Sequence, residues 1–154
     1  MTQEQIWYFS YGSNLSKQQM LRRTGSIPEA RTAFLSDHRL AFRKVREGHD
    51  VYATIVPKDG ATVFGVAYLC SPYAIGQLDV FEGVAEHCYR REMIEVTTGL
   101  GENLSCVVYI GESFVIEDAV PSPEYWNLIQ SGAIEHQLPS DYIESIAALA
   151  RGKV

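Results

Sequence analysis

The sequence predicts a single α+β domain in which a mixed sheet, rich in hairpins, is combined with a few helices. Its 154 residues, 46% of them hydrophobic, are enough for one compact core, and no linker-like or low-complexity stretch divides residues 1–154. Turn signals predict two hairpins. About six strand-like and four helical segments follow one another without regular alternation, so few β-α-β crossovers are expected.

The first elements are a strand over residues 6–11 and a helix that follows it closely. Ser16 and Gln19 have the spacing of a capping box at the start of this helix. Between the two elements the chain leaves the strand at Gly12. Backbone N–H groups at such a junction can hold an anion, although many junctions of this kind are only connections.

A strand-rich region comes next. Residues 30–45 are strand-like around a polar Ser-Asp pair at positions 36 and 37. The apolar segments 51–56 and 62–70 flank the sequence Pro-Lys-Asp-Gly, which is typical of a tight turn. The pattern predicts a hairpin between these two segments.

The helix after this region ends at the strongest single candidate for chemistry. Ser71 as N-cap and Pro72 predict its start, and Gly83 predicts its stop, so that Glu82 is expected as the last helical residue. A carboxylate there faces the negative end of the helix dipole, where Lys or Arg would gain about 0.3–1 kcal/mol. Apolar neighbours could bury Glu82 and raise its pKa toward the range of proton transfer. The alternative is an exposed Glu at a frayed helix end.

The last part of the chain predicts one more hairpin and two helices. Residues 89–97 and 104–110 are strand-like and are joined by a short polar loop. Ser122 is expected to cap one helix, and Ser140 is expected to cap the final helix.

Charge and composition exclude several classes of partner. A net charge of −6 argues against nucleic acid and against an anionic membrane surface. The pairs Arg22–Arg23 and Arg90–Arg91 are expected to be solvated. No segment approaches the length of a membrane span, and residues 1–5 lack the order of a signal peptide, so a cytoplasmic protein is expected.

Cysteine and histidine residues give no metal or nucleophile site. Cys70, Cys88 and Cys106 are widely spaced and are expected to be reduced, half-buried thiols. No CxxC motif or histidine pair supports a metal. Adjacent residues of a strand point to opposite faces, which argues against a pair of His87 with Cys88. Ser13 has no nucleophile-elbow context, and hydrogen bonding in the loop or to a substrate is its expected role.

Taken in order along nearly the whole chain, several motifs resemble the γ-glutamylcyclotransferase family, which has the AIG2-like fold. YFSYGSNL resembles the substrate loop of that family, and GVAYL followed by LDVFEGV resembles the segment with its catalytic glutamate, here Glu82. Tyr89, CVVY with Tyr109, and PSPEY with Tyr125 resemble the rest of its site, and GAIEHQLPSDYIESI resembles its C-terminal helices.

The resemblance implies a small mixed β-barrel with flanking helices and an activity that converts a γ-glutamyl amino acid or related amide to 5-oxoproline and the free amine. Such an intramolecular cyclisation needs orientation and proton transfer, and it implies no cofactor. Glu82 would be the general acid and base. The substrate-binding residues implied are Tyr11, Gly12, Ser13, Asn14, Leu15, Tyr89, Tyr109 and Tyr125.

The loop sequence YGSN favours the branch of the family that acts on γ-glutamyl amino acids, since glutathione-specific relatives tend to YGSL and the γ-glutamylamine branch to YGTL. Two alternatives stay open. The substrate could be a γ-glutamyl amine or a pathway-specific γ-glutamyl intermediate, or the chain could be a catalytically silent small-molecule-binding module on the same scaffold. Whether the chain forms a homodimer is also left open.

Overall fold

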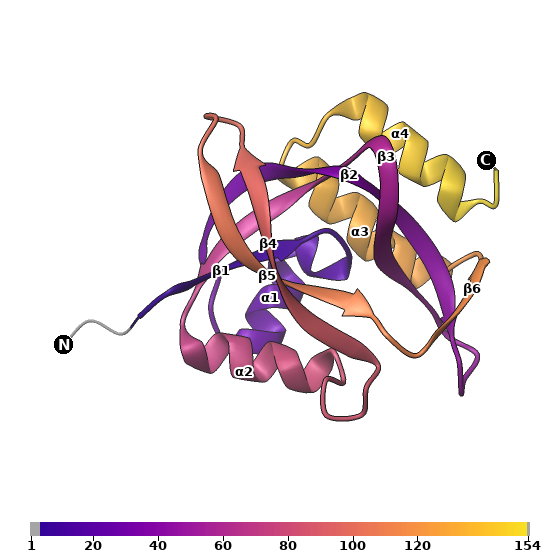
Figure 1. Cartoon of the computed structure of the whole chain (residues 1–154), viewed down its shortest axis with the longest axis horizontal. Helices are drawn as coiled ribbons and strands as arrows, with labels where there is room; N and C mark the ends of the chain where they lie inside the picture. Colours follow the sequence, from indigo (N-terminus) through magenta and orange to yellow (C-terminus); the bar gives the residue numbers. More distant parts are fainter. Residues whose placement is uncertain (1–3, 154) are drawn as a thin grey trace.

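The computed structural model describes residues 4–153 and contains a small β-barrel with helices around it (Figure 1). Met1 to Gln3 and Val154 lie outside the described residues. They belong to the predicted domain, and Met1 to Gln3 also belong to the segment that was expected to lack a signal peptide. The elements in chain order are β1 (Ile6–Ser10), the short 3-10 helix η1 (Ser13–Leu15), α1 (Lys17–Thr24), β2 (Glu29–Val45), β3 (Val51–Cys70), α2 (Pro72–Phe81), β4 (Tyr89–Thr98), β5 (Asn103–Gly111), β6 (Phe114–Asp118), α3 (Pro123–Glu135) and α4 (Ser140–Ala150).

Five strands form a closed ring, and the sixth lies at its edge. The strand order is β3-β1-β5-β4-β2-β6, and a further pairing of β2 with β3 closes the ring. β1 is antiparallel to β3 and parallel to β5, with Tyr8 opposite Val107. The sheet is therefore mixed and closed, as the resemblance implied. The hairpin of residues 89–97 with 104–110 is also confirmed, as β4 and β5.

The hairpin expected around residues 57–60 is wrong. β3 runs without reversal from Val51 to Cys70, and both of its halves pair with β2. The register of the β2–β3 pair shifts between Ser36 and His38, and the N–H of Gly60 donates a hydrogen bond to Asp37 Oδ1 at 2.9 Å. Asp37 and Gly60 both have positive φ angles, of 59° and 79°. The Pro, Asp and Gly residues therefore mark a β-bulge that bends two long strands around the barrel, which uses the same residue types as a turn.

Three of the four predicted helix caps are confirmed. The side chains of Ser16, Ser71 and Ser122 each accept a hydrogen bond from a backbone N–H in the first turn of α1, α2 and α3. The fourth is wrong by one residue, because Pro139 is the N-cap of α4 and Ser140 is its first helical residue. Glu82 likewise lies one residue beyond the expected place: α2 ends at Phe81 and Glu82 is its C-cap.

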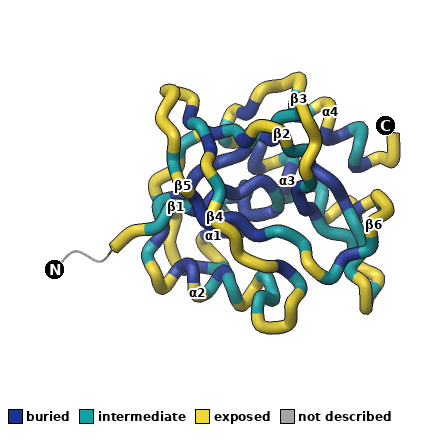
Figure 2. The backbone as a smooth tube through the Cα atoms, in the orientation of Figure 1, coloured by how far each residue is buried: buried dark blue, intermediate teal, exposed yellow. Residues whose placement is uncertain are grey.

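The core fills the barrel and the space between the barrel and the helices, and the inward-facing parts of the strands are buried (Figure 2). Two glycines let the segment after β1 sit deep in this core. A Cβ at Gly65 of β3 would lie 2.2 Å from the carbonyl oxygen of Ser10, and a Cβ at Gly132 of α3 would lie 2.4 Å from the carbonyl carbon of Leu15. Both positions therefore need glycine, because only glycine allows two backbones to approach so closely.

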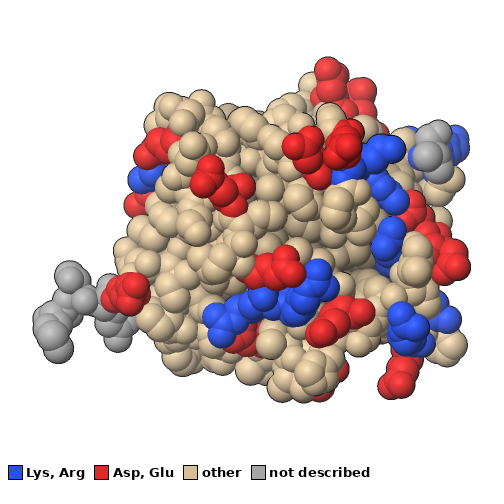
Figure 3. Space-filling model, viewed as in Figure 1, with Lys and Arg blue, Asp and Glu red and all other residues tan. Residues whose placement is uncertain are grey.

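The surface carries charges of both signs. On the face shown in Figure 3, Lys and Arg side chains lie among Asp and Glu side chains and form no continuous basic surface. Between residues 4 and 153, no helix is both long and apolar enough to cross a membrane, and no group of three His, Cys, Asp or Glu side chains could hold a metal ion. Cys70 and Cys106 are buried, Cys88 is half-buried, and all three are free thiols.

Candidate active site

A pocket opens where β1 ends and η1 begins, and it brings together every predicted site residue except Leu15. We call it the inner pocket. Its lining consists of Tyr8, Tyr11, Gly12, Ser13, Asn14, Ala53, Glu82, Tyr89, Tyr109 and Tyr125. These residues come from six strands and helices and from the turns after β1 and α2, so the site depends on closure of the barrel.

Leu15 lies in the core and does not line the inner pocket. Its side chain is fully buried, and its N–H donates to the carbonyl of Gly12 at 3.0 Å. Likewise, the N–H of Ser16 donates to the carbonyl of Ser13 at 3.1 Å. The predicted anion cradle therefore narrows to the N–H groups of Gly12, Ser13 and Asn14, since the first N–H groups of a helix have no partner within it.

Gly12 leaves space in the pocket wall. A Cβ at this position would lie 3.5 Å from the Cβ of Ala53 and 3.6 Å from the hydroxyl of Tyr125, which is ordinary contact. A larger side chain would have to project into the pocket or push these two residues apart. Glycine at position 12 therefore leaves space for a ligand close to the backbone.

Glu82 projects into this pocket from the end of α2. Its side chain is 15% exposed, and its Oε1 lies 3.3 Å from the Nδ2 of Asn14 and 3.8 Å from Nη1 of Arg23. Burial raises the pKa of the carboxyl group from 4.5 to about 7, against the smaller lowering effects of Arg23 and Asn14. Near neutral pH this carboxyl group can therefore both accept and donate a proton. The exposed and frayed alternative for Glu82 is excluded.

Asn14 holds the Glu82 carboxylate through a network that uses both ends of its amide. Nδ2 also donates to the hydroxyl of Tyr8 at 3.0 Å, while Oδ1 accepts from Arg23 Nη1 at 3.1 Å and from Gln19 Nε2 at 3.3 Å. A guanidinium can only donate, so Oδ1 must face Arg23 and Nδ2 must face Glu82. The side chain of Asn14 is thus occupied in positioning Glu82, and its backbone N–H is the part that faces the pocket.

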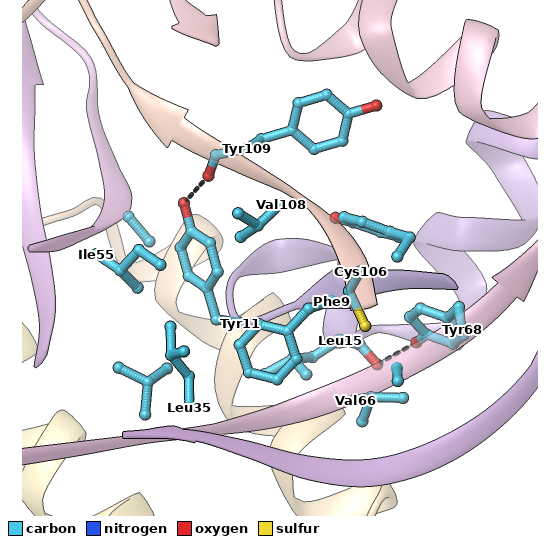
Figure 4. Packing of buried hydrophobic residues seen from close by; sticks show 14 of the residues in the cluster. Phe9, Tyr11, Leu15, Leu35, Ile55, Val66, Tyr68, Cys106, Val108 and Tyr109 are labelled. Atoms are coloured by element: carbon cyan, nitrogen blue, oxygen red, sulfur yellow. Dashed lines mark hydrogen bonds between the residues drawn. The ribbon is translucent and has the colours of Figure 1, made fainter. Parts of the chain in front are cut away.

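The five pocket tyrosines fall into two groups. Three of them donate their hydroxyl hydrogen to the protein: Tyr11 to the carbonyl of Tyr109, Tyr89 to the carbonyl of Ala53, and Tyr109 to Asp79 Oδ1 at 2.7 Å. Figure 4 shows the carbonyl of Tyr109 meeting the Tyr11 hydroxyl while the Tyr109 ring points away. These three residues shape the pocket with their rings, and their hydroxyl hydrogens are already used.

Tyr8 and Tyr125 form the second group. Their hydroxyl oxygens accept hydrogen bonds, from Asn14 Nδ2 and from the N–H of Ala53 at 3.0 Å. Within the described part of the chain neither hydroxyl donates a hydrogen bond, so each can donate its hydrogen to a ligand. Burial raises the pKa of both phenols, so they act as neutral donors.

Sequence reasoning missed three residues of the site. The sequence pattern marks Tyr8 only as a strand residue, and Ala53 comes from β3, much further along the chain. Arg23 was expected to be solvated, but its side chain is only 24% exposed and faces Glu82. The spacing of Gln19 and Arg23, four residues apart on α1, places both on one helix face and could have signalled that they share Asn14 as a partner.

The turn before β4 also differs from expectation. His87 and Cys88 lie in this turn and not on a strand, and the His87 side chain is 78% exposed beside Glu112. Cys88 lines a second pocket, which we call the outer pocket. Its lining consists of Ser13, Arg23, Tyr52, Phe81, Glu82, Gly83, Cys88, Tyr89 and Tyr125. Glu82 therefore lies at the boundary between the inner and the outer pocket.

Known proteins share this fold and much of this sequence. Residues 62–146 match the AIG2-like family. A γ-glutamylcyclotransferase of Mus musculus is 34% identical over 95% of this chain and 79% of its own length, and the γ-glutamylcyclotransferase of Homo sapiens is 32% identical over 96% and 80%. A solved structure of a γ-glutamyl cyclotransferase superposes with a TM-score of 0.85 at 32% identity, covering 94% of this chain and 88% of that one.

The fold and the sequence define a small AIG2-like β-barrel domain with one acidic residue at the pocket. This chain belongs to the γ-glutamylcyclotransferase family.

Proposed function

We propose that this protein is a γ-glutamylcyclotransferase, which converts a γ-glutamyl amino acid to 5-oxoproline and the free amino acid. The observation that carries the proposal is the carboxyl group of Glu82, held by Asn14 beside the loop after β1, with a pKa raised to about 7. The two mammalian relatives that share about a third of the sequence carry the same activity in their names.

We place the γ-glutamyl group in the inner pocket, because the reaction needs a folded substrate in a confined space. The N–H groups of Gly12, Ser13 and Asn14 face an anionic oxygen of the substrate, and its α-ammonium group lies toward Glu82. The rings of Tyr11, Tyr89 and Tyr109 close the pocket around the carbon chain. This placement brings the α-nitrogen and the γ-carbonyl carbon of the same molecule into contact.

Glu82 then moves protons in both directions. Its carboxylate takes a proton from the α-ammonium group, and the free amine attacks the γ-carbonyl carbon to close a five-membered ring. The carbonyl oxygen becomes an oxyanion, toward which Tyr8 and Tyr125 can donate their hydroxyl hydrogens. The protonated Glu82 gives its proton to the leaving nitrogen, the C–N bond breaks, and the ring carbonyl reforms. The ring nitrogen, which is cationic after the attack, gives its extra proton to the Glu82 carboxylate, which passes it to the departing amine. The products are 5-oxoproline and an ammonium group, and Glu82 is again a carboxylate.

The chain's own groups suffice for these steps, so no cofactor enters the proposal. The loop sequence YGSN favours γ-glutamyl amino acids as substrates.

The experiment that tests the proposal is an assay of 5-oxoproline with a panel of γ-glutamyl amino acids, γ-glutamyl amines and glutathione. We expect turnover of γ-glutamyl amino acids by the wild-type protein. Binding of these compounds without any 5-oxoproline would instead indicate a silent binding module, and turnover of amines alone would indicate the amine branch.

A further inference from the structure

The outer pocket contains a cation that the proposed reaction does not use. Arg23 lines this pocket, and Glu82 is the other charged side chain that Arg23 contacts, at 3.8 Å. The remaining lining is aromatic, small or a thiol. Glu47 and Glu86 line a separate depression beyond Tyr52 and Cys88, together with Arg46 and His87.

The guanidinium of Arg23 is held in place before any ligand arrives. It lies over the ring of Phe81, 5.0 Å from the ring centre, and its Nη1 donates to Asn14 Oδ1. Within residues 4–153 this is the one hydrogen bond that the guanidinium donates, and it comes from Nη1. Nε and Nη2 are therefore the donors that remain, and together they match the two oxygens of a carboxylate.

The reaction geometry brings a carboxylate to this place. The leaving nitrogen must come within hydrogen-bonding reach of Glu82 to receive its proton. In an α-amino acid the carboxylate carbon is only two bonds from that nitrogen, across bonds of about 1.5 Å each. A leaving nitrogen beside Glu82 therefore places the α-carboxylate within a few ångströms of Arg23, on the side of the outer pocket.

Charge balance supports the same arrangement. When Glu82 takes up the proton of the α-ammonium group it becomes neutral, and the half-buried Arg23 then loses the one anion that it contacts among residues 4–153. A carboxylate on the leaving group would restore a partner for this cation, whereas a neutral amine would leave it without one.

We infer that Arg23 forms the binding subsite for the α-carboxylate of the leaving amino acid and so selects γ-glutamyl amino acids over γ-glutamyl amines and amides. This inference rests on the proposed function, since it names the leaving group of that reaction. Arg23 is a specificity residue here and takes no part in proton transfer.

The test compares γ-glutamyl-alanine with γ-glutamyl-alaninamide, which has nearly the same shape but no carboxylate. For the wild-type protein, kcat/KM for the acid should exceed that for the amide by about 10-fold or more, as expected for a charge-assisted bidentate contact. In Arg23→Gln this ratio should fall to within about twofold of one, with most of the loss in KM of the acid. The variant Arg23→Lys should keep part of the preference, because lysine keeps the positive charge but lacks the paired N–H donors of a guanidinium.

The ratio separates this role from others. An effect of Arg23 on Glu82 alone would lower both substrates equally, and a loss of folded protein would cancel in the ratio. Arg22→Gln is the matched control, since Arg22 is exposed on the same helix, and it should keep the wild-type ratio. A wild-type ratio near one, or an unchanged ratio in Arg23→Gln, would overturn the inference while leaving the proposed function intact. No 5-oxoproline from any γ-glutamyl compound would overturn both.

Discussion

The inner and the outer pocket share Ser13, Glu82, Tyr89 and Tyr125, and they differ in the remaining residues of their lining. In the inner pocket nearly every polar group is tied to another part of the protein: Tyr11, Tyr89 and Tyr109 donate to fixed acceptors, and Asn14 has partners at both ends of its amide. The residues that line only the outer pocket are Arg23, Tyr52, Phe81, Gly83 and Cys88, and they are half-buried or exposed; Phe81, for example, is 53% exposed. This difference indicates that the hydrogen-bonded residues of the inner pocket position the reacting groups. The more exposed residues of the outer pocket leave room for different leaving groups.

The largest expected effect comes from Glu82, the acidic residue among those that the two pockets share. Glu82→Gln should keep the fold and lower kcat by at least about 100-fold, because the amide is nearly isosteric but cannot accept a proton. Formation of 5-oxoproline is measured beside Glu86→Gln, an exposed neighbour that should behave as wild type. Wild-type turnover by a folded Glu82→Gln protein would remove Glu82 from the mechanism.

Removing the support of Glu82 should have the next largest effect and would show whether the inner pocket must be rigid. Asn14→Ala leaves Glu82, Tyr8 and Arg23 without their shared partner, and we expect kcat to fall by about 10- to 100-fold. The acid limb of the pH profile should move to higher pH, because the Asn14 hydrogen bond lowers the pKa of Glu82. If kcat and the pH profile both stayed as in wild type, Asn14 would not be a positioning residue.

The loop after β1 should act through its backbone and the space around it. Gly12→Val should raise KM by about 10-fold, because its methyl groups would project toward Ala53 and Tyr125, where the substrate lies. Ser13→Ala should change KM by less than about threefold and cost about 1 kcal/mol of stability, since the Ser13 hydroxyl accepts from Gln19 Nε2 at 2.7 Å. Steady-state kinetics and thermal melts of both variants provide the comparison. A harmless Gly12→Val would place the substrate elsewhere.

The last prediction concerns the stability of the fold and leaves activity aside. The pKa of Glu82 is raised on folding, so the native protein holds its proton more tightly than the unfolded chain between pH 4.5 and about 7. The charged carboxylate therefore destabilises the native protein. This cost is absent below pH 4.5, grows between pH 4.5 and 7, and reaches about 3 kcal/mol above pH 7. Thermal melts should show Glu82→Gln gaining on wild type as the pH rises from 4 to 8. A stability difference independent of pH would mean that Glu82 is not desolvated.

Local sequence signals predicted those parts of the fold that depend on neighbouring residues. The serine caps of α1, α2 and α3 and the β4–β5 hairpin could be predicted because each is decided within a few residues. The bulge at Asp37 and Gly60 could not be told from a turn, because both need the same backbone conformations. Only the pairing with β2, far away along the chain, decides between them.

The candidate site shows the same division. Glu82 and the loop residues could be proposed from motifs, but the functions of their hydroxyl and amide groups depend on partners from other elements. Tyr8 and Tyr125 keep a free hydroxyl hydrogen because of Asn14 and Ala53, and Arg23 turns toward Glu82 because α1 lies beside α2. These relations exist only once the barrel is closed, so no local pattern contains them.

The most direct test of the central claim, that Glu82 transfers the proton from a pKa near 7, is the pH dependence of kcat/KM for γ-glutamyl-alanine between pH 5 and 9. The substrate is titrated alone so that its own groups are accounted for. The account predicts that kcat/KM rises about tenfold per pH unit on the acid side and levels off above an apparent pKa of about 7. A rate that stays flat from pH 5 to 8 would contradict it.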